Sequence, residues 1–150
     1  MSRSTYPLVA VATAVGLVAS ACSSSSDSAT KTSPPVTAAQ LQSLIPTPPN
    51  SQHTDGPASI PDNGIRMHFM VNGSATVVMD AYKTELQGKG WTVTVVSSGG
   101  WQGAGGATYT GTQGNDYGVF SGGGSTGTTD ITACAWPSKP SSPNCGGGTR

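Results

Sequence analysis

One amphipathic helix pattern constrains the fold more than any other feature of the chain. In residues 74–90, SATVVMDAYKTELQGKG, apolar side chains recur at helical spacing along a single stripe, namely Ala75, Val78, Met79, Tyr82 and Leu86. This spacing predicts a helix that buries one face, with Ser74 as its N-cap. A lone helix cannot bury such a stripe, so the remaining chain must supply a surface to cover it.

The segments around this helix have the alternation of strands. Residues 64–71, GIRMHFMV, place apolar side chains at every second position, and residues 91–96, WTVTVV, resume that period after the helix. Three further strand candidates are 107–112, 116–121 and 129–136. We therefore expect an α+β fold, in which one amphipathic helix packs on a mostly antiparallel four- to five-stranded sheet in β-α-β-β-β order. The glycine-rich residues 97–106 are expected to form a loop.

The first residues predict an export signal. Arg3 precedes the uncharged apolar run LVAVATAVGLVA at 8–19, which is too short to span a bilayer as a helix. A signal peptide over residues 1–21 accounts for this pattern. The alternative is a short buried helix, but the polar segment that follows offers it nothing to pack against.

Cys22 follows the signal at a distinctive junction. The sequence ASAC at 19–22 resembles the lipobox of bacterial lipoproteins, whose cysteine carries a diacylglyceryl group and acyl chains such as palmitate. Ala19 departs from that motif, which usually has a larger aliphatic residue there. The resemblance implies a lipid anchor in the membrane at Cys22. Cleavage at an A-x-A-like site would instead give a soluble secreted protein.

With Cys22 lipidated, Cys134 and Cys145 remain as an even pair in an exported, oxidising setting. We expect them to form a disulfide that holds the C-terminal tail, worth about 3 kcal/mol by chain entropy. Trp136 is expected to pack against it. Two free thiols are the alternative. Neither His53 nor His68 lies at a zinc-finger spacing, so no metal site is expected.

The residues between anchor and domain are rich in serine, threonine and proline. We expect residues 22–58 to form a tether and residues 59–150 a small folded domain. Within the tether, AAQLQSLI at 38–45 has helical spacing and is either a short helix or a segment that docks on the domain. Whether the tether is O-glycosylated or an unmodified spacer is open.

The composition excludes one class of partner and supplies no catalytic or cofactor motif. Seven basic and seven acidic residues give no net charge, so nucleic acid is not an expected partner. The sequence GGSTG at 123–127 fits the nucleophile-elbow pattern, with Ser125 as the nucleophile, but a strand follows it where that motif needs a helix. A set of Ser125, His68 and Asp130 has no supporting spacing. We expect no enzyme and no cofactor, with a small envelope hydrolase using Ser125 as the alternative.

Trp101 is the best candidate for a contact with a partner. It stands among glycines that give it little cover, and exposed indoles stack on sugars or anchor protein partners. A cell-wall glycan or an envelope protein is the expected partner. The alternative is that Trp101 folds back as a lid over the core.

One stretch resembles a known group of proteins. DAYKTELQGKGWTV at 80–93, together with TDITACAWPSKP and the later Cys145, is similar to a motif in small exported actinobacterial, especially mycobacterial, lipoproteins. The resemblance implies that Tyr82, Leu86, Gly90 and Trp91 are structural, and it implies no catalytic residue. We therefore expect a lipid-anchored protein on the outer face of the cell membrane, acting as a non-catalytic binding or structural module.

Overall fold

The computed structural model describes residues 35–101 and 104–145. The chain divides into two units, residues 1–33 and 34–150, and every described residue belongs to the second. The predicted signal peptide and Cys22 lie outside the described residues.

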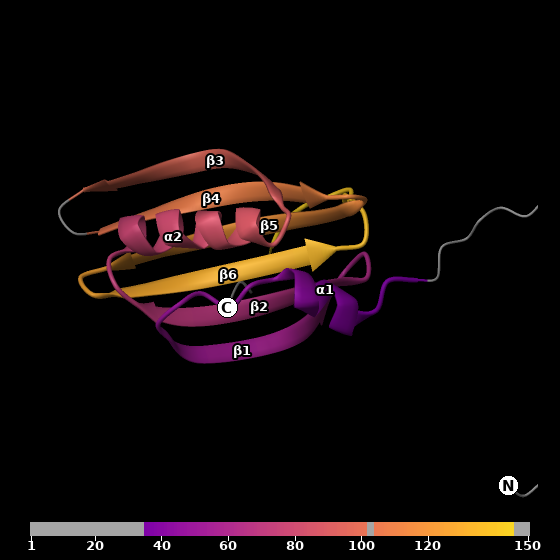
Figure 1. Cartoon of the computed structure of the whole chain (residues 1–150), viewed down its shortest axis with the longest axis horizontal. Helices are drawn as coiled ribbons and strands as arrows, with labels where there is room; N and C mark the ends of the chain where they lie inside the picture. The colour runs from indigo at the N-terminus through magenta and orange to yellow at the C-terminus, as the bar shows by residue number, and fades with distance from the viewer. Residues whose placement is uncertain (1–34, 102–103, 146–150) are drawn as a thin grey trace, which may run out of the picture. The chain divides into compact units, whose positions relative to one another are not determined.

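The described residues form two helices and six strands (Figure 1). In chain order these are α1 Ala38–Leu44, β1 Ser51–Ile60, β2 Gly64–Asn72, α2 Ala75–Gly88, β3 Thr92–Trp101, β4 Ala104–Gln113, β5 Asp116–Ser125 and β6 Thr128–Trp136. The strands make one sheet in the order β1-β2-β6-β5-β4-β3, and every neighbouring pair is antiparallel.

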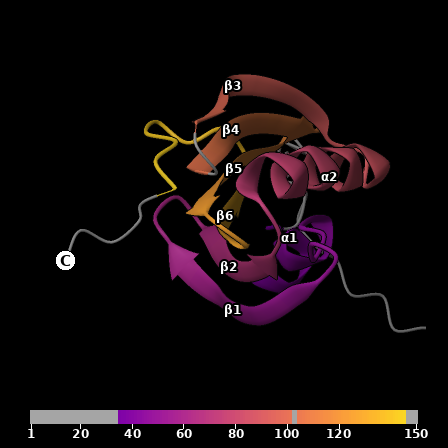
Figure 2. The same ribbon diagram turned by 90° about the vertical axis from the view of Figure 1, so that its left-hand side faces the viewer.

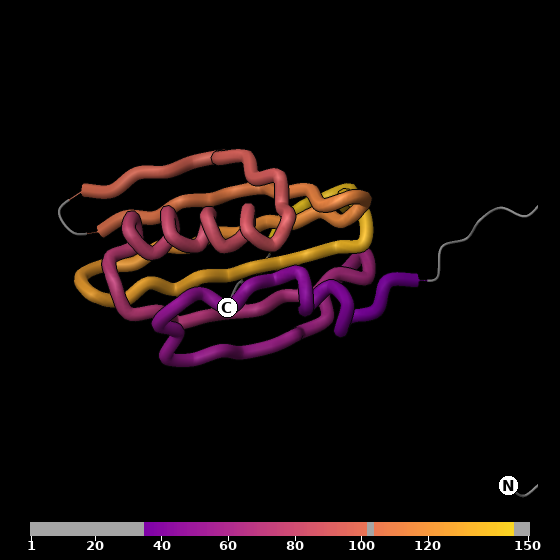
Figure 3. Tube along the Cα trace, viewed as in Figure 1, coloured from indigo at the N-terminus to yellow at the C-terminus, as the bar shows by residue number. Residues whose placement is uncertain are grey.

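The position of α2 follows from this strand order. Four antiparallel steps separate β2 from β3, so the two strands run in the same direction and lie far apart in the sheet. A tight turn cannot join parallel strands, and a crossover is required. Figure 3 follows the chain from β2 through α2, which lies along the strands over the middle of the sheet, to the edge strand β3.

The predicted stripe of α2 is the centre of the core. Ala75, Val78, Met79, Tyr82 and Leu86 are all buried. The Phe120 ring lies edge-on to both neighbouring aromatic rings, with centroid distances of 6.2 Å to Tyr82 and 5.3 Å to Trp91. Such edge-to-face pairs add to the free energy gained by burial. The helix predicted over 74–90 is confirmed, with Ser74 at its N-cap.

The segment at 38–45 is both a short helix and a docked one. A capping box of Thr37 and Gln40 begins α1, and Leu41 is fully buried in the core. The indole N–H of Trp91 donates to the carbonyl oxygen of Leu44 at 2.8 Å, which fixes the end of α1. Figure 2 shows α1 and α2 on the same face of the sheet.

The predicted fold class is wrong in the number of strands and helices. The sheet has six strands, and the extra strand β1 and helix α1 come from residues 38–60, most of which the sequence assigns to the tether. β1 has no alternation to detect because it is an edge strand, whose side chains are almost all exposed. Pro57 lies within it, and an edge strand tolerates proline since one side of its backbone needs no partner.

The expected glycine loop is also wrong. β3 continues to Trp101 and β4 begins at Ala104, so most of residues 97–106 are paired strand. Glycine is depleted in strands because it lacks a side chain to pack. Backbone pairing needs no side chain, however, and Gly99 pairs with Gly106 while Gly100 pairs with Gly105.

The disulfide between Cys134 and Cys145 is confirmed, with a Cα–Cα distance of 5.6 Å. Together with Val119 and Trp136 it forms a second buried cluster, so the expected packing of Trp136 against it is also confirmed. The segment that follows β6 lies across the sheet from the helices (Figure 2). The disulfide therefore gives this small domain a second core on that face.

We expect reduction of the disulfide, or the double substitution Cys134→Ala and Cys145→Ala, to lower the free energy of unfolding by about 3 kcal/mol. The closed loop is short, with a sequence separation of 11, so the loss is moderate. Urea unfolding with and without reductant measures it. An unchanged midpoint would show that the tail contributes nothing to stability.

Burial of the Tyr82 hydroxyl gives a second expectation. This oxygen is buried without a hydrogen-bond partner among the described residues, and burial raises the pKa of Tyr82 strongly. We expect Tyr82→Phe to raise the free energy of unfolding by about 1 kcal/mol, because an unsatisfied buried hydroxyl costs stability.

The pH dependence provides the control for Tyr82→Phe. The folded chain keeps the buried Tyr82 hydroxyl neutral, so the ionisation of Tyr82 does not lower the free energy of unfolding below the unfolded pKa near 10.0, and it lowers that free energy progressively as the pH rises above this value. The Tyr82→Phe variant should lose less stability there than the wild type. A variant less stable than wild type at neutral pH would show that the hydroxyl has a partner.

Candidate functional site

An open cavity of about 490 Å³ lies between the first two turns of α2 and the glycine-rich ends of β3 and β4. Its volume is in the range of small-molecule binding sites. The helix contributes Ser74, Thr76 and Asp80, and the strands contribute Ser98, Trp101 and Tyr109. The rest of the lining is apolar side chain and bare glycine backbone.

Glycine brings the start of α2 close to the sheet beside this cavity. A Cβ atom at Gly100 or Gly105 would lie 3.3 Å or 3.1 Å from the Thr76 hydroxyl oxygen. Contacts this short are tighter than ordinary van der Waals contact, so larger side chains there would push α2 away from the sheet. The two residues pair across β3 and β4, so they form one side-chain-free floor below Thr76.

The helix end brings hydrogen-bond donors to the cavity. Ser74 is the N-cap, but its side chain makes no capping hydrogen bond. Helical bonding begins where the N–H of Val78 donates to the carbonyl of Ser74, so the amides of Ala75 and Thr76 have no partner within the helix. Both residues line the cavity, so these amide groups lie at its wall.

Asp80 provides the charge of the site. It is the sole charged residue among the described residues that line the cavity, and it is exposed. Burial, and secondly the charge of Asp80, raise the pKa of Tyr109. The Tyr109 hydroxyl is therefore protonated at neutral pH and can donate a hydrogen bond.

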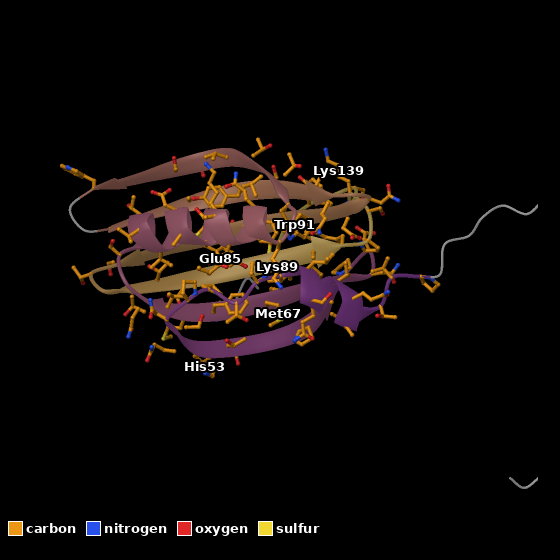
Figure 4. All side chains as sticks on the ribbon, viewed as in Figure 1. His53, Met67, Glu85, Lys89, Trp91 and Lys139 are labelled. Carbon is orange, nitrogen blue, oxygen red and sulfur yellow. A yellow bond between two sulfur atoms is a disulfide. The ribbon has the colours of Figure 1, made fainter. Side chains whose placement is uncertain are left out.

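Trp101 is one of the residues that line the cavity, and 82% of its surface is exposed. It does not cover the core as a lid. Trp91, near the C-terminal end of α2 in Figure 4, and Trp136 are buried, and the indole N–H groups of both donate to backbone carbonyls. Trp101 is thus the tryptophan available to a partner in the described part of the chain.

The structure brings His68 and Asp130 together but not Ser125. His68 Nε2 lies 3.5 Å from Asp130 Oδ1, and its Nδ1 lies 3.9 Å from Asp55 Oδ2. Along β6, however, Ser125 is opposite Thr128, whereas His68 is opposite Thr132. Four residues of strand separate these positions by about 13 Å. No Ser125–His68–Asp130 hydrogen-bonded triad forms.

His53, expected in the tether, is part of the same surface cluster. On the edge strand β1, its Nε2 lies 3.0 Å from Asp55 Oδ2 (Figure 4). Within residues 35–101 and 104–145, no group of three or more histidine, cysteine, aspartate or glutamate side chains is placed to hold a metal ion.

The sequence predicted Trp101 but not the cavity beside it. Thr76 and Asp80 lie outside the buried stripe of α2, on the helix face that the sequence pattern assigns to solvent. The spacing of the glycines could have indicated the hairpin of β3 and β4. Gly99 and Gly100 are arranged symmetrically to Gly105 and Gly106 about a short connection, and these residues pair across the two strands.

Comparisons with known proteins give no relatives: no family model matches the chain, and no curated protein or solved structure matches it significantly. Among the described residues, no helix combines the length and the apolar character needed to cross a membrane.

We expect Trp101→Phe to remove most of the iodide-quenchable tryptophan fluorescence, because the other two indoles are buried. Trp101→Ala should leave the free energy of unfolding nearly unchanged. The matched variant Trp91→Ala should lower it by about 3–5 kcal/mol, since it empties a buried ring site. Quenching that persists in Trp101→Phe would show that Trp91 or Trp136 is accessible.

Proposed function

We propose that this protein is a lipid-anchored, non-catalytic binding module on the outer face of the cell membrane, and that the cavity beside α2 is its binding site. The observation that carries the proposal is the combination of an open cavity with an exposed indole among the residues that line it. Rigid elements hold the cavity, since α2 and the sheet share the main core. Exposed aromatic side chains of this kind anchor ligands.

The arrangement of side chains favours binding over catalysis. A hydrolase of the serine type needs its nucleophile within hydrogen-bond reach of a base, and the register keeps Ser125 away from His68. The cavity itself contains Asp80 but no histidine, cysteine or lysine among its described lining residues. No paired acid and base face one another there.

The proposed anchor is Cys22, as in the lipoproteins that the sequence resembles. Two or more acyl chains hold a protein stably at a membrane without a spanning helix. We expect mass spectrometry of the mature N-terminus to find an acylated Cys22, and Cys22→Ser to move the protein from the membrane to the soluble fraction. An unmodified cysteine in membrane-associated wild-type protein would contradict the anchor.

The binding proposal can be tested by NMR spectroscopy of the ¹⁵N-labelled full chain in detergent micelles. We expect soluble fragments of digested cell envelope to shift amide signals of residues 74–80, 98–101 and 104–107, and to leave those around Glu85 unchanged. Trp101→Ala should reduce these shifts, whereas Val96→Ala, another exposed side chain of β3, should not.

Mass spectra of the added fragments should remain unchanged after incubation, because the proposed module only binds. Cleavage that Ser125→Ala abolishes would replace this proposal with the hydrolase alternative. An absence of shifts at the cavity with every fragment would refute the binding site.

A further inference from the structure

The geometry points to a neutral saccharide as the ligand of the cavity. This inference rests on the proposed function and names the class of ligand that the site would hold. It depends on the hydrogen-bonding groups, the charges and the apolar surface that the described residues bring to the cavity.

The charges at the cavity favour neither an anionic nor a cationic ligand. The cavity contains the Asp80 carboxylate and no cationic side chain among its described lining residues, and the N-terminus of α2 adds the partial positive charge of the helix dipole. The carboxylate repels an anion and attracts a cation, whereas the helix end does the reverse, so the two effects oppose each other for a ligand of either charge. A ligand without net charge meets neither repulsion.

The hydrogen-bonding groups are mixed, and a polyol matches both kinds. The amides of Ala75 and Thr76 and the protonated Tyr109 hydroxyl are donors. The Asp80 carboxylate accepts only, and the Ser98 hydroxyl can donate or accept. Every hydroxyl of a sugar likewise donates and accepts, so one ring can satisfy both sets.

Apolar surface completes the match. Ala104 and Trp101 line the cavity and are exposed, so a methyl group and an indole offer apolar surface to a ligand. A pyranose ring presents C–H groups on its faces and hydroxyls at its rim, which suits an aromatic side chain beside polar groups. Because 82% of its surface is exposed, Trp101 can also contact an oligosaccharide that extends beyond the cavity.

Isothermal titration of the full chain tests this inference, in a detergent without a sugar headgroup such as lauryldimethylamine oxide. The neutral probes are cellotetraose and chitotetraose, and the charged probes are inorganic phosphate and tetralysine. We expect at least one tetrasaccharide to bind and neither charged probe to bind.

Substitutions with matched controls locate the binding. Asp80→Asn and Trp101→Ala should each weaken tetrasaccharide binding about tenfold or more. The same change in charge on α2 outside the cavity, Glu85→Gln, and the exposed-strand change Val96→Ala should leave it within twofold. Equal affinity in all four variants would place the sugar elsewhere and overturn the inference.

The remaining outcomes separate this inference from the proposed function. If neither tetrasaccharide binds while envelope fragments still shift the cavity amides in the NMR experiment, the saccharide class is wrong and the binding module stands. Preferential binding of phosphate or tetralysine also overturns the saccharide class. If no probe and no fragment perturbs the cavity, both proposals fail.

Discussion

The packing of α2 across the sheet is the constraint on which the rest of the structure depends. Without a crossover, β2 and β3 could not run parallel at such separated positions, and the sheet would lack a cover for its apolar face. Tyr82 inserts between Phe69 and Phe120, and Phe120 in turn contacts Trp91. The helix thereby links strands from both halves of the sheet through one aromatic cluster.

Glycine permits close packing at both ends of α2. A Cβ atom at Gly118 would lie 2.5 Å from the Phe120 ring, so its absence admits the aromatic cluster. At the N-terminal end of α2, a Cβ atom at Gly105 would lie 3.1 Å from the Thr76 hydroxyl oxygen, so the bare backbone of β4 lets the helix approach the sheet beside the cavity.

The two faces of the sheet are stabilised by different means. On one face, α2 and α1 form the main core, and the hydrogen bond from Trp91 to Leu44 joins α1 to it. On the other face, the disulfide and Trp136 cover Val119. A domain of this size has a modest core, and a covalent link on its second face compensates for that.

The sequence by itself determined the elements whose burial repeats with a regular period. The stripe of α2 and the alternation of β2 are visible because each buries one continuous face, and the cysteine pair was visible from its count once Cys22 was assigned elsewhere. Trp101 was predicted to be exposed because glycines surround it, and it is exposed, while its contact with a partner stays a prediction. The lipid anchor stays a prediction from the lipobox resemblance.

Only the tertiary structure decided the edge strand, the hairpin of β3 and β4, and the cavity. β1 is held by backbone hydrogen bonds to β2 rather than by burial, so its side chains carry no periodic signal. The glycines of β3 and β4 pair through their backbones, which composition alone assigns to a loop. The cavity arises where these bare strands pass under Thr76 and Asp80, two residues that local sequence places on a solvated helix face. Its existence is a property of how distant segments meet.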